Sequence, residues 1–174
     1  MKEEIFTLKT ILDAFYKTKG TQATKRLIFD QSQLHGIGSK WIKVFFFSLP
    51  ILLYVGIFNP TIFGMLGIAQ AIIFYIVFLS MVMIMIAGLT FINNNKVIRQ
   101  VKPTWNTLFP TVDLTQVLSS GATPYKDFVK HYHEVLKQDL KEEKLHAYLA
   151  NAFKIMQEEN SELFDAMNNA RNAR

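Results

Sequence analysis

The feature that constrains this chain most is a long stretch without charge. Residues 44–95 contain no Asp, Glu, Lys, Arg or His, a run of 52 residues in a chain of 174. A helix needs roughly 20 apolar residues to cross the core of a bilayer, so the run is too long for one crossing and suits two. Core helices of soluble proteins carry a polar face, whereas residues 73–89 are apolar on every side. The pattern predicts a transmembrane helical hairpin over residues 41–92.

An Asn-Pro pair in the middle of this stretch predicts where the hairpin turns. Pro60 lacks an N–H and disfavours helical geometry at Asn59, and Asn-Pro is a turn-initiating pair. We therefore expect helices at about 41–58 and 61–92, joined at residues 59–60.

The basic residues near the hairpin predict its orientation. They flank both predicted helices and are missing from the turn: Lys25, Arg26, Lys40, Lys43, Lys96, Arg99 and Lys102. Because loops rich in Lys and Arg stay in the cytoplasm, both termini are expected there. The composition, rich in Ile, Phe, Asn and Lys, is typical of an AT-rich bacterial gene, so the predicted location is a bacterial inner membrane. Trp41, Lys40 and Lys43 are the predicted interface anchors.

The remaining parts read as helical, which makes the predicted fold class all-α. Residues 1–40 contain an amphipathic pattern, Ile5, Leu8, Ile11, Leu12 and Phe15, followed by a polar linker. That helix can lie on the inner leaflet or pack on the C-terminal region, and its acidic residues favour the second. Residues 93–123 read as a cytoplasmic loop region with a short helix at 113–119.

Residues 124–174 are predicted to be a cytoplasmic helical region. A long helix is expected to begin with Thr123 as N-cap and Pro124 at its first position. Its apolar stripe changes phase near residues 141–144, so either the helix breaks there or the stripe winds around it. Asn160 and Ser161 predict a further helix start.

No residue pattern predicts catalysis, a metal or a cofactor. His131 and His133 would point to different sides of a helix, so with Glu134 they make a poor zinc site. Gly36 and Gly38 before Lys40 lack the spacing of a phosphate-binding loop. The chain has no cysteine, which excludes disulfide and thiolate chemistry.

Small residues in the second helix predict a packing face. Gly64, Gly67 and Ala71 have the spacing that lets helices approach closely, and Gln70 beside them can hydrogen-bond across an interface. This face can serve either the first helix of the hairpin or an intermolecular partner.

The expected function is therefore interaction within a membrane. A non-enzymatic accessory or inhibitory subunit of a larger assembly fits best. Small basic two-helix proteins of this kind include exclusion and immunity proteins, which block conjugative DNA entry or a toxin. The alternative is a homo-oligomeric pore or a membrane-remodelling protein. The expected partners are the lipid bilayer and a membrane protein or further copies of the chain. No nucleic acid is expected, because cytoplasmic flanks explain the net charge of +5.

Overall fold

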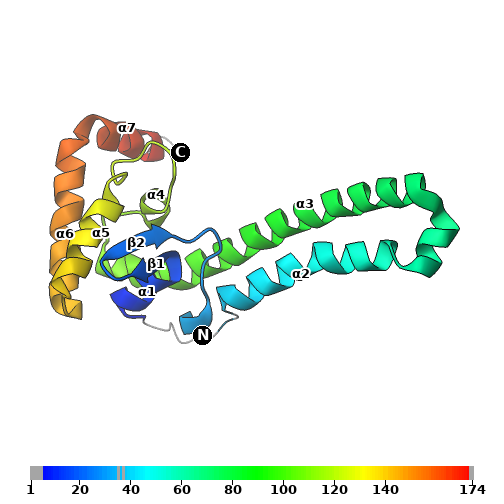
Figure 1. Cartoon of the computed structure of the whole chain (residues 1–174). Coiled ribbons are helices and arrows are strands. Elements are labelled where there is room, and N and C mark those ends of the chain that lie inside the picture. Colours follow the sequence, from blue (N-terminus) through cyan, green and yellow to red (C-terminus); the bar gives the residue numbers. More distant parts are fainter. Residues whose placement is uncertain (1–5, 35, 37, 173–174) are drawn as a thin grey trace. The chain divides into compact units, whose positions relative to one another are not determined.

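A computed structural model describes residues 6–34, 36 and 38–172, with side chains as far as residue 169. The protein is mostly helical, with 75% of residues in helices and 5% in strands, and Figure 1 shows its elements in chain order. The chain forms two compact units. The first, called the terminal unit, joins residues 1–27 to residues 97–174, and the second, called the hairpin unit, holds residues 28–96.

Two antiparallel helices make up most of the hairpin unit (Figure 1). Helix α2 spans Ser39–Ile57, and α3 spans Pro60–Leu108, of which residues 60–96 belong to this unit. The side chain of Asn59 accepts a hydrogen bond from the backbone N–H of Thr61 at 3.0 Å, which caps the start of α3. The two helices are separated by Phe58 and Asn59, next to the predicted turn at residues 59–60. A short 3₁₀ helix, η1, spans Ser32–Leu34.

Helix α3 does not end at residue 92 as predicted. It continues to Leu108, so residues 93–108 of the predicted loop are helical. Val97, Val101 and Trp105 recur at a spacing of four and are fully buried, which gives this extension an apolar stripe. Pro103 lies on the exposed side of the helix. The prolines of this region suggested a loop, but burial of that stripe outweighs the loss of one backbone hydrogen bond.

The terminal unit contains a small sheet that corrects the all-α prediction. Helix α1, Leu8–Phe15, leads into strand β1, Tyr16–Lys19, which pairs antiparallel with β2, Gln22–Lys25. Gly20 occupies the two-residue turn with a φ of +59°, a conformation that glycine adopts at little cost. Part of the predicted linker is therefore a strand.

The buried face of α1 packs within the terminal unit, in contact with α6. This confirms the preferred alternative for the N-terminal helix, although Ile5 lies outside the described residues. The side chains on this face are at most 2% exposed: Leu8, Ile11, Leu12, Ala14 and Phe15. Because protein covers the apolar face of α1, that face is not free to insert into a lipid surface.

In the described part of the terminal unit, four helices follow α3: α4 Leu114–Val117, α5 Phe128–Gln138, α6 Glu142–Glu159 and α7 Ser161–Asn172. The short helix predicted near residue 113 and the helix start after Asn160 are confirmed. Of the two alternatives left open near residues 141–144, the structure shows the helix break: α5 ends at Gln138, Asp139 adopts a left-handed φ of 45°, and α6 begins at Glu142. The prediction of Thr123 as N-cap is wrong. Thr123 and Pro124 are buried in a turn, and α5 begins at Phe128.

An aromatic cluster forms the centre of the terminal unit. Phe153 of α6 has ring centroids of Trp105, Phe109, Tyr125 and Phe128 within 5.1–5.9 Å. The indole N–H of Trp105 donates to the carbonyl of Val112 at 2.9 Å, so this buried polar group is satisfied. The rings therefore connect α6 with α3, with α5 and with the loop before it.

Candidate functional site

The exposed apolar surface of α2 and α3 is the most unusual feature of the molecule. Within the described part of the chain, these two helices are long and apolar enough to cross a membrane. Of the most apolar 18-residue stretch of each helix, none is buried in α3 and 11% in α2. Phe47, Ile84 and Phe91 are 76%, 74% and 68% exposed. Large apolar patches on a protein surface mark contact with a membrane or with another protein.

The predicted packing face is interrupted at its centre. Gly67 has a φ of 73° and a ψ of 168°, so α3 bends there and is not one regular helix. The premise that Gly64, Gly67 and Ala71 share one continuous helix face is therefore wrong. Ala71 is fully buried, while Gly64, Gly67 and Gln70 are exposed. That the exposed three contact a partner stays a prediction.

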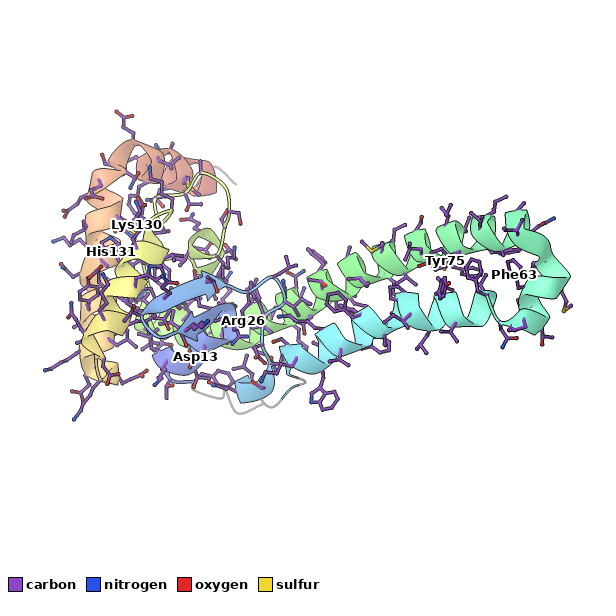
Figure 2. All side chains as sticks on the ribbon, in the orientation of Figure 1. Asp13, Arg26, Phe63, Tyr75, Lys130 and His131 are labelled. Carbon is purple, nitrogen blue, oxygen red and sulfur yellow. The ribbon has the colours of Figure 1, made fainter. Side chains whose placement is uncertain are left out.

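Four aromatic rings gather where the hairpin closes. Tyr75 of α3 lies 6.0 Å from Tyr54 and 6.1 Å from Phe58, measured between ring centroids. Phe58 also contacts Phe63 at 5.8 Å. Figure 2 shows Phe63 and Tyr75 between the two helices near the turn. These contacts fix the register of the hairpin, because they place Tyr75 level with the last turn of α2.

At the open end of the hairpin, side-chain amides bind the segment that precedes α2. The backbone N–H of Phe29 donates to Oδ1 of Asn94 at 2.9 Å, and the amide of Asn93 donates to the carbonyl of Phe29 at 3.0 Å. Gln31, only 6% exposed, donates to Oδ1 of Asn93 at 2.7 Å. We call this set, Phe29, Gln31, Asn93 and Asn94, the amide clamp. It ties the entry of the first hairpin helix to the exit of the second.

Asp30 organises the start of α2. Its carboxylate accepts hydrogen bonds from the backbone N–H and the hydroxyl of Ser39, both at 3.3 Å. An acidic group at this position complements the helix dipole and satisfies a free N–H. The predicted interface anchors come next, near the start of α2. Trp41 is 73% exposed, and Lys40 and Lys43 are exposed.

Two histidines of the terminal unit, His133 and His146, contact backbone carbonyls. The ring of His133 lies 2.9 Å from the carbonyl of Ala23 in β2, and that of His146 lies 2.9 Å from the carbonyl of Leu108. Each therefore joins a helix to another element of the terminal unit. Among residues 6–34, 36 and 38–172, no group of three or more His, Cys, Asp or Glu is placed to hold a metal ion.

Burial shifts the pKa of several groups in the terminal unit. It raises the pKa of Tyr16 and of Tyr132, whose rings are 5.6 Å apart, because the charged phenolate is disfavoured away from water. Desolvation also raises the pKa of Asp13, although Lys9 and Arg26 oppose it. Figure 2 shows Asp13 and Arg26 near one another.

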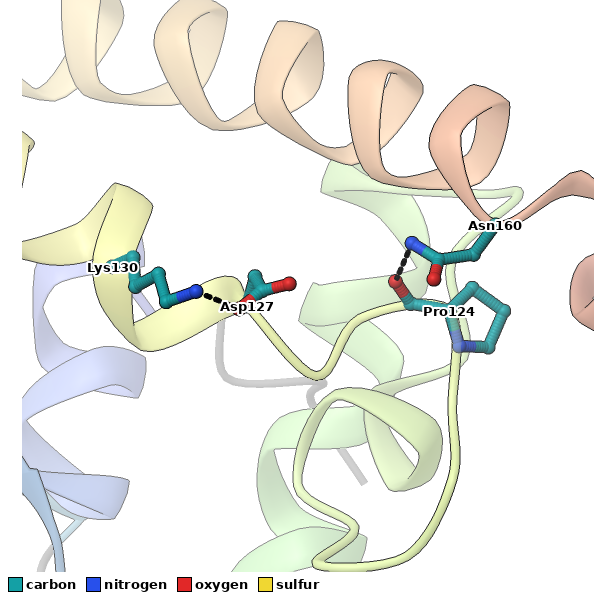
Figure 3. Close-up of polar contacts among 4 residues, drawn as sticks. All are labelled: Pro124, Asp127, Lys130 and Asn160. Carbon is teal, nitrogen blue, oxygen red and sulfur yellow. Dashed lines mark hydrogen bonds and ion pairs between the residues drawn. The ribbon is translucent and has the colours of Figure 1, made fainter.

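A surface contact shifts the pKa of one carboxylate and one amine of the terminal unit. A hydrogen bond from Lys130 lowers the pKa of Asp127, and Asp127 in turn raises the pKa of Lys130. Figure 3 shows this pair, 2.6 Å apart, beside the hydrogen bond of 3.3 Å from Asn160 to the carbonyl of Pro124. An exposed pair between residues one helical turn apart is a stabilising surface contact rather than a catalytic arrangement.

Comparison of the chain with known protein families, with curated proteins and with solved structures finds no match.

Sequence reasoning missed the amide clamp and the bend at Gly67. One signal for the clamp was available: three asparagines, residues 93–95, directly follow the apolar stretch. Asparagine is unfavourable inside a helix unless its side chain has a partner, so the triplet pointed to contacts. No comparable signal exists for Gly67, because glycine also occurs in regular membrane helices.

Proposed function

We propose that this chain is a non-enzymatic membrane protein that crosses a bacterial inner membrane twice and binds a larger membrane assembly as an accessory or inhibitory subunit. One observation carries the membrane part of the proposal. A core helix of a soluble protein can be equally long and apolar but is mostly buried, whereas the most apolar 18-residue stretch of α3 has no buried residue. So large an apolar surface needs lipid around it.

The charges at the ends of the hairpin support an orientation with both termini in the cytoplasm. The turn is uncharged, while Lys40 and Lys43 stand at the start of α2 and Lys96 follows the apolar part of α3. Basic residues at one end of both helices favour the cytoplasmic side for that end. The exposed ring of Trp41 suits the boundary between headgroups and acyl chains.

The polar groups of the terminal unit support an interaction role over catalysis. His133 and His146 each contact a backbone carbonyl. The phenols with raised pKa values, Tyr16 and Tyr132, are 2% and 3% exposed, so a substrate does not reach them. Titratable side chains with these contacts stabilise a fold. The terminal unit then serves as a cytoplasmic domain carried by the hairpin.

The proposed contact with the partner consists of the exposed residues Gly64, Gly67 and Gln70 of α3. A Cβ added at Gly64 meets nothing within 4 Å, so the chain itself has room for a larger side chain there. A partner packed closely against Gly64 would leave no room for a larger side chain there. Gly88 offers a matched control, because an added Cβ there also meets nothing within 4 Å.

The test is a pull-down of the tagged chain from its native cells in mild detergent, with mass spectrometry. We expect a stoichiometric membrane protein to co-purify with the Gly88→Leu variant and to be lost with the Gly64→Leu variant. Equal retention by both variants would remove Gly64 from the contact. Exclusion and immunity are two forms of an inhibitory subunit, and the identity of the partner decides between them.

A homo-oligomeric pore is the alternative function. It is favoured by the same exposed face, since Gln70 is a polar side chain that can line a passage or bond to a second copy. A purified preparation containing only this chain, together with dye leakage from cells that express it, would select the pore. Intact cells under strong expression would exclude it.

A further inference from the structure

The bend at Gly67 divides α3 into a short helix, residues 60–66, and the long helix that follows. A φ of 73° with a ψ of 168° lies in a region populated almost only by glycine. A side chain at this position would be strained whatever the space around it. The bend is therefore a built-in feature that depends on this residue type.

A bend of this kind cannot lie in the hydrocarbon core at low cost. At a helix end, backbone N–H and C=O groups lose their partners one turn away. In lipid each unsatisfied group is strongly unfavourable, whereas water and headgroups can hydrogen-bond to these groups. Gly67 is therefore expected at the surface of the membrane rather than in its centre.

The register of the hairpin also places Gly67 at the membrane surface. Tyr75 lies beside Tyr54 and Phe58 at the end of α2, and Asn93 lies in the amide clamp at the other end. From Tyr75 to Asn93 the helix rises about 27 Å at about 1.5 Å per residue, close to the thickness of about 30 Å of a hydrocarbon core. Aromatic rings with hydroxyls mark membrane interfaces. Residues 59–73 then lie beyond the core, on the side of the turn.

These residues, which we call the tip segment, are nevertheless uncharged and mostly apolar. Ile62, Met65 and Ile68 are 43%, 83% and 68% exposed. Such side chains are unfavourable in water, and the boundary between headgroups and acyl chains accepts both them and the polar backbone at the bend. The tip segment continues directly from the membrane-facing surface of the hairpin, which favours lipid over water around it.

From these observations we infer that the tip segment is an interfacial element inserted into the outer leaflet, with the Gly67 bend turning helix 60–66 along the membrane surface. The inference rests on the proposed membrane hairpin. The ligand is the headgroup–acyl boundary of phospholipids. A protein partner that contacts Gly64 then does so at the level of the outer leaflet.

The depth of single fluorescent probes tests this placement. The chain has no cysteine, so Met65→Cys and Ile84→Cys each give one site for an environment-sensitive dye, and both positions are strongly exposed. The full chain is placed in vesicles of phosphatidylethanolamine and phosphatidylglycerol that contain lipids spin-labelled near the headgroup or deep in the acyl chain. We expect the probe at residue 65 to be quenched mainly by the shallow label and the probe at residue 84 mainly by the deep label.

The other outcomes overturn the inference and separate it from the proposed function. Deep quenching at both residues would place the tip segment inside the core. A probe at residue 65 that resists both labels and is quenched by aqueous iodide would place it in water. Neither result would affect the hairpin. Failure of the deep label to quench at residue 84 would refute the membrane hairpin itself, and with it the inference.

Substitution of Gly67 tests the role of the bend separately. Gly67→Ala disfavours the bent backbone, so helix 60–66 should project from the membrane and the probe at residue 65 should lose its shallow quenching. Gly88→Ala, in the regular part of α3, is the matched control and should leave the quenching unchanged. Unchanged quenching in Gly67→Ala would show that the bend does not hold the tip segment at the surface.

Discussion

Truncation of Phe153 should severely destabilise the terminal unit. The ring is 2% exposed and contacts four other aromatic rings, among them Trp105. Phe→Ala in a core costs about 3–5 kcal/mol, and aromatic pairs contribute about 0.5–1.5 kcal/mol beyond burial, which favours the upper part of that range. A whole domain is stable by only about 5–15 kcal/mol. Phe153→Ala should therefore leave the terminal unit marginally folded.

Trp105 provides the assay for this prediction. The chain has two tryptophans, Trp41 in the hairpin unit and Trp105 in the terminal unit. In a Trp41→Phe background, fluorescence during denaturant unfolding in detergent micelles reports the terminal unit alone. The free energy of unfolding should fall by about 3–5 kcal/mol for Phe153→Ala and by less for Phe153→Leu, which keeps most of the apolar volume.

A neighbouring residue on the same helix gives the control. Ile155 is 36% exposed, and Ile155→Ala should cost clearly less than Phe153→Ala because little buried volume is lost. Equal small losses for the two alanine variants would refute the conclusion that the aromatic cluster is the core of the terminal unit.

Two further predictions concern pH and the amide clamp. Burial holds the pKa of the Asp13 carboxyl above its ordinary 3.8, so the folded state binds the carboxyl proton more tightly than the unfolded state does. Protonation of Asp13 therefore stabilises the fold at low pH, and this contribution is lost as the pH rises from the unfolded-state pKa through the folded-state pKa. Asp13→Asn should therefore stabilise the protein at neutral pH and not below pH ~4, measured by the unfolding midpoint; the same gain at both pH values would contradict this. A Cβ at Gly36 would lie 2.3 Å from Oε1 of Gln31. Gly36→Ala should displace Gln31 from Asn93 and accelerate proteolysis before α2, whereas Gly38→Ala, with 3.7 Å to the nearest atom, should not; equal rates would count against the clamp.

Local chemistry explains which parts of the fold the sequence could predict. An uncharged run of 52 residues leaves few alternatives to long apolar helices, and Pro60 places their turn. The phase change in the apolar stripe left a helix break after α5 as one of two alternatives, and the helix-start signal at Asn160 predicted the start of α7. Each of these features depends on residues close together in the chain.

The features that escaped prediction depend on contacts between distant residues. Pro103 suggested a loop, and only the burial of Val101 and Trp105 in the tertiary structure keeps that region helical. The amide clamp joins residues more than 60 positions apart. Strands β1 and β2 are four residues long and mostly polar, too short for an alternating pattern.

The predicted site was only partly recoverable for a related reason. The spacing of Gly64, Gly67 and Ala71 is meaningful only on a regular helix, and glycine permits a regular helix and a sharp bend alike. The sequence predicted the apolar character of residues 64–71 but not the path of their backbone.

The most direct test of the account is the accessibility of single cysteines in intact cells. Thr61→Cys lies near the turn and Gly121→Cys in an exposed loop of the terminal unit, and a membrane-impermeant maleimide is added before or after permeabilisation of the inner membrane. We expect residue 61 to react from outside and residue 121 to react only after permeabilisation. Protection of both residues until permeabilisation would show that the hairpin does not cross the membrane, and reaction of both from outside would contradict a cytoplasmic terminal unit.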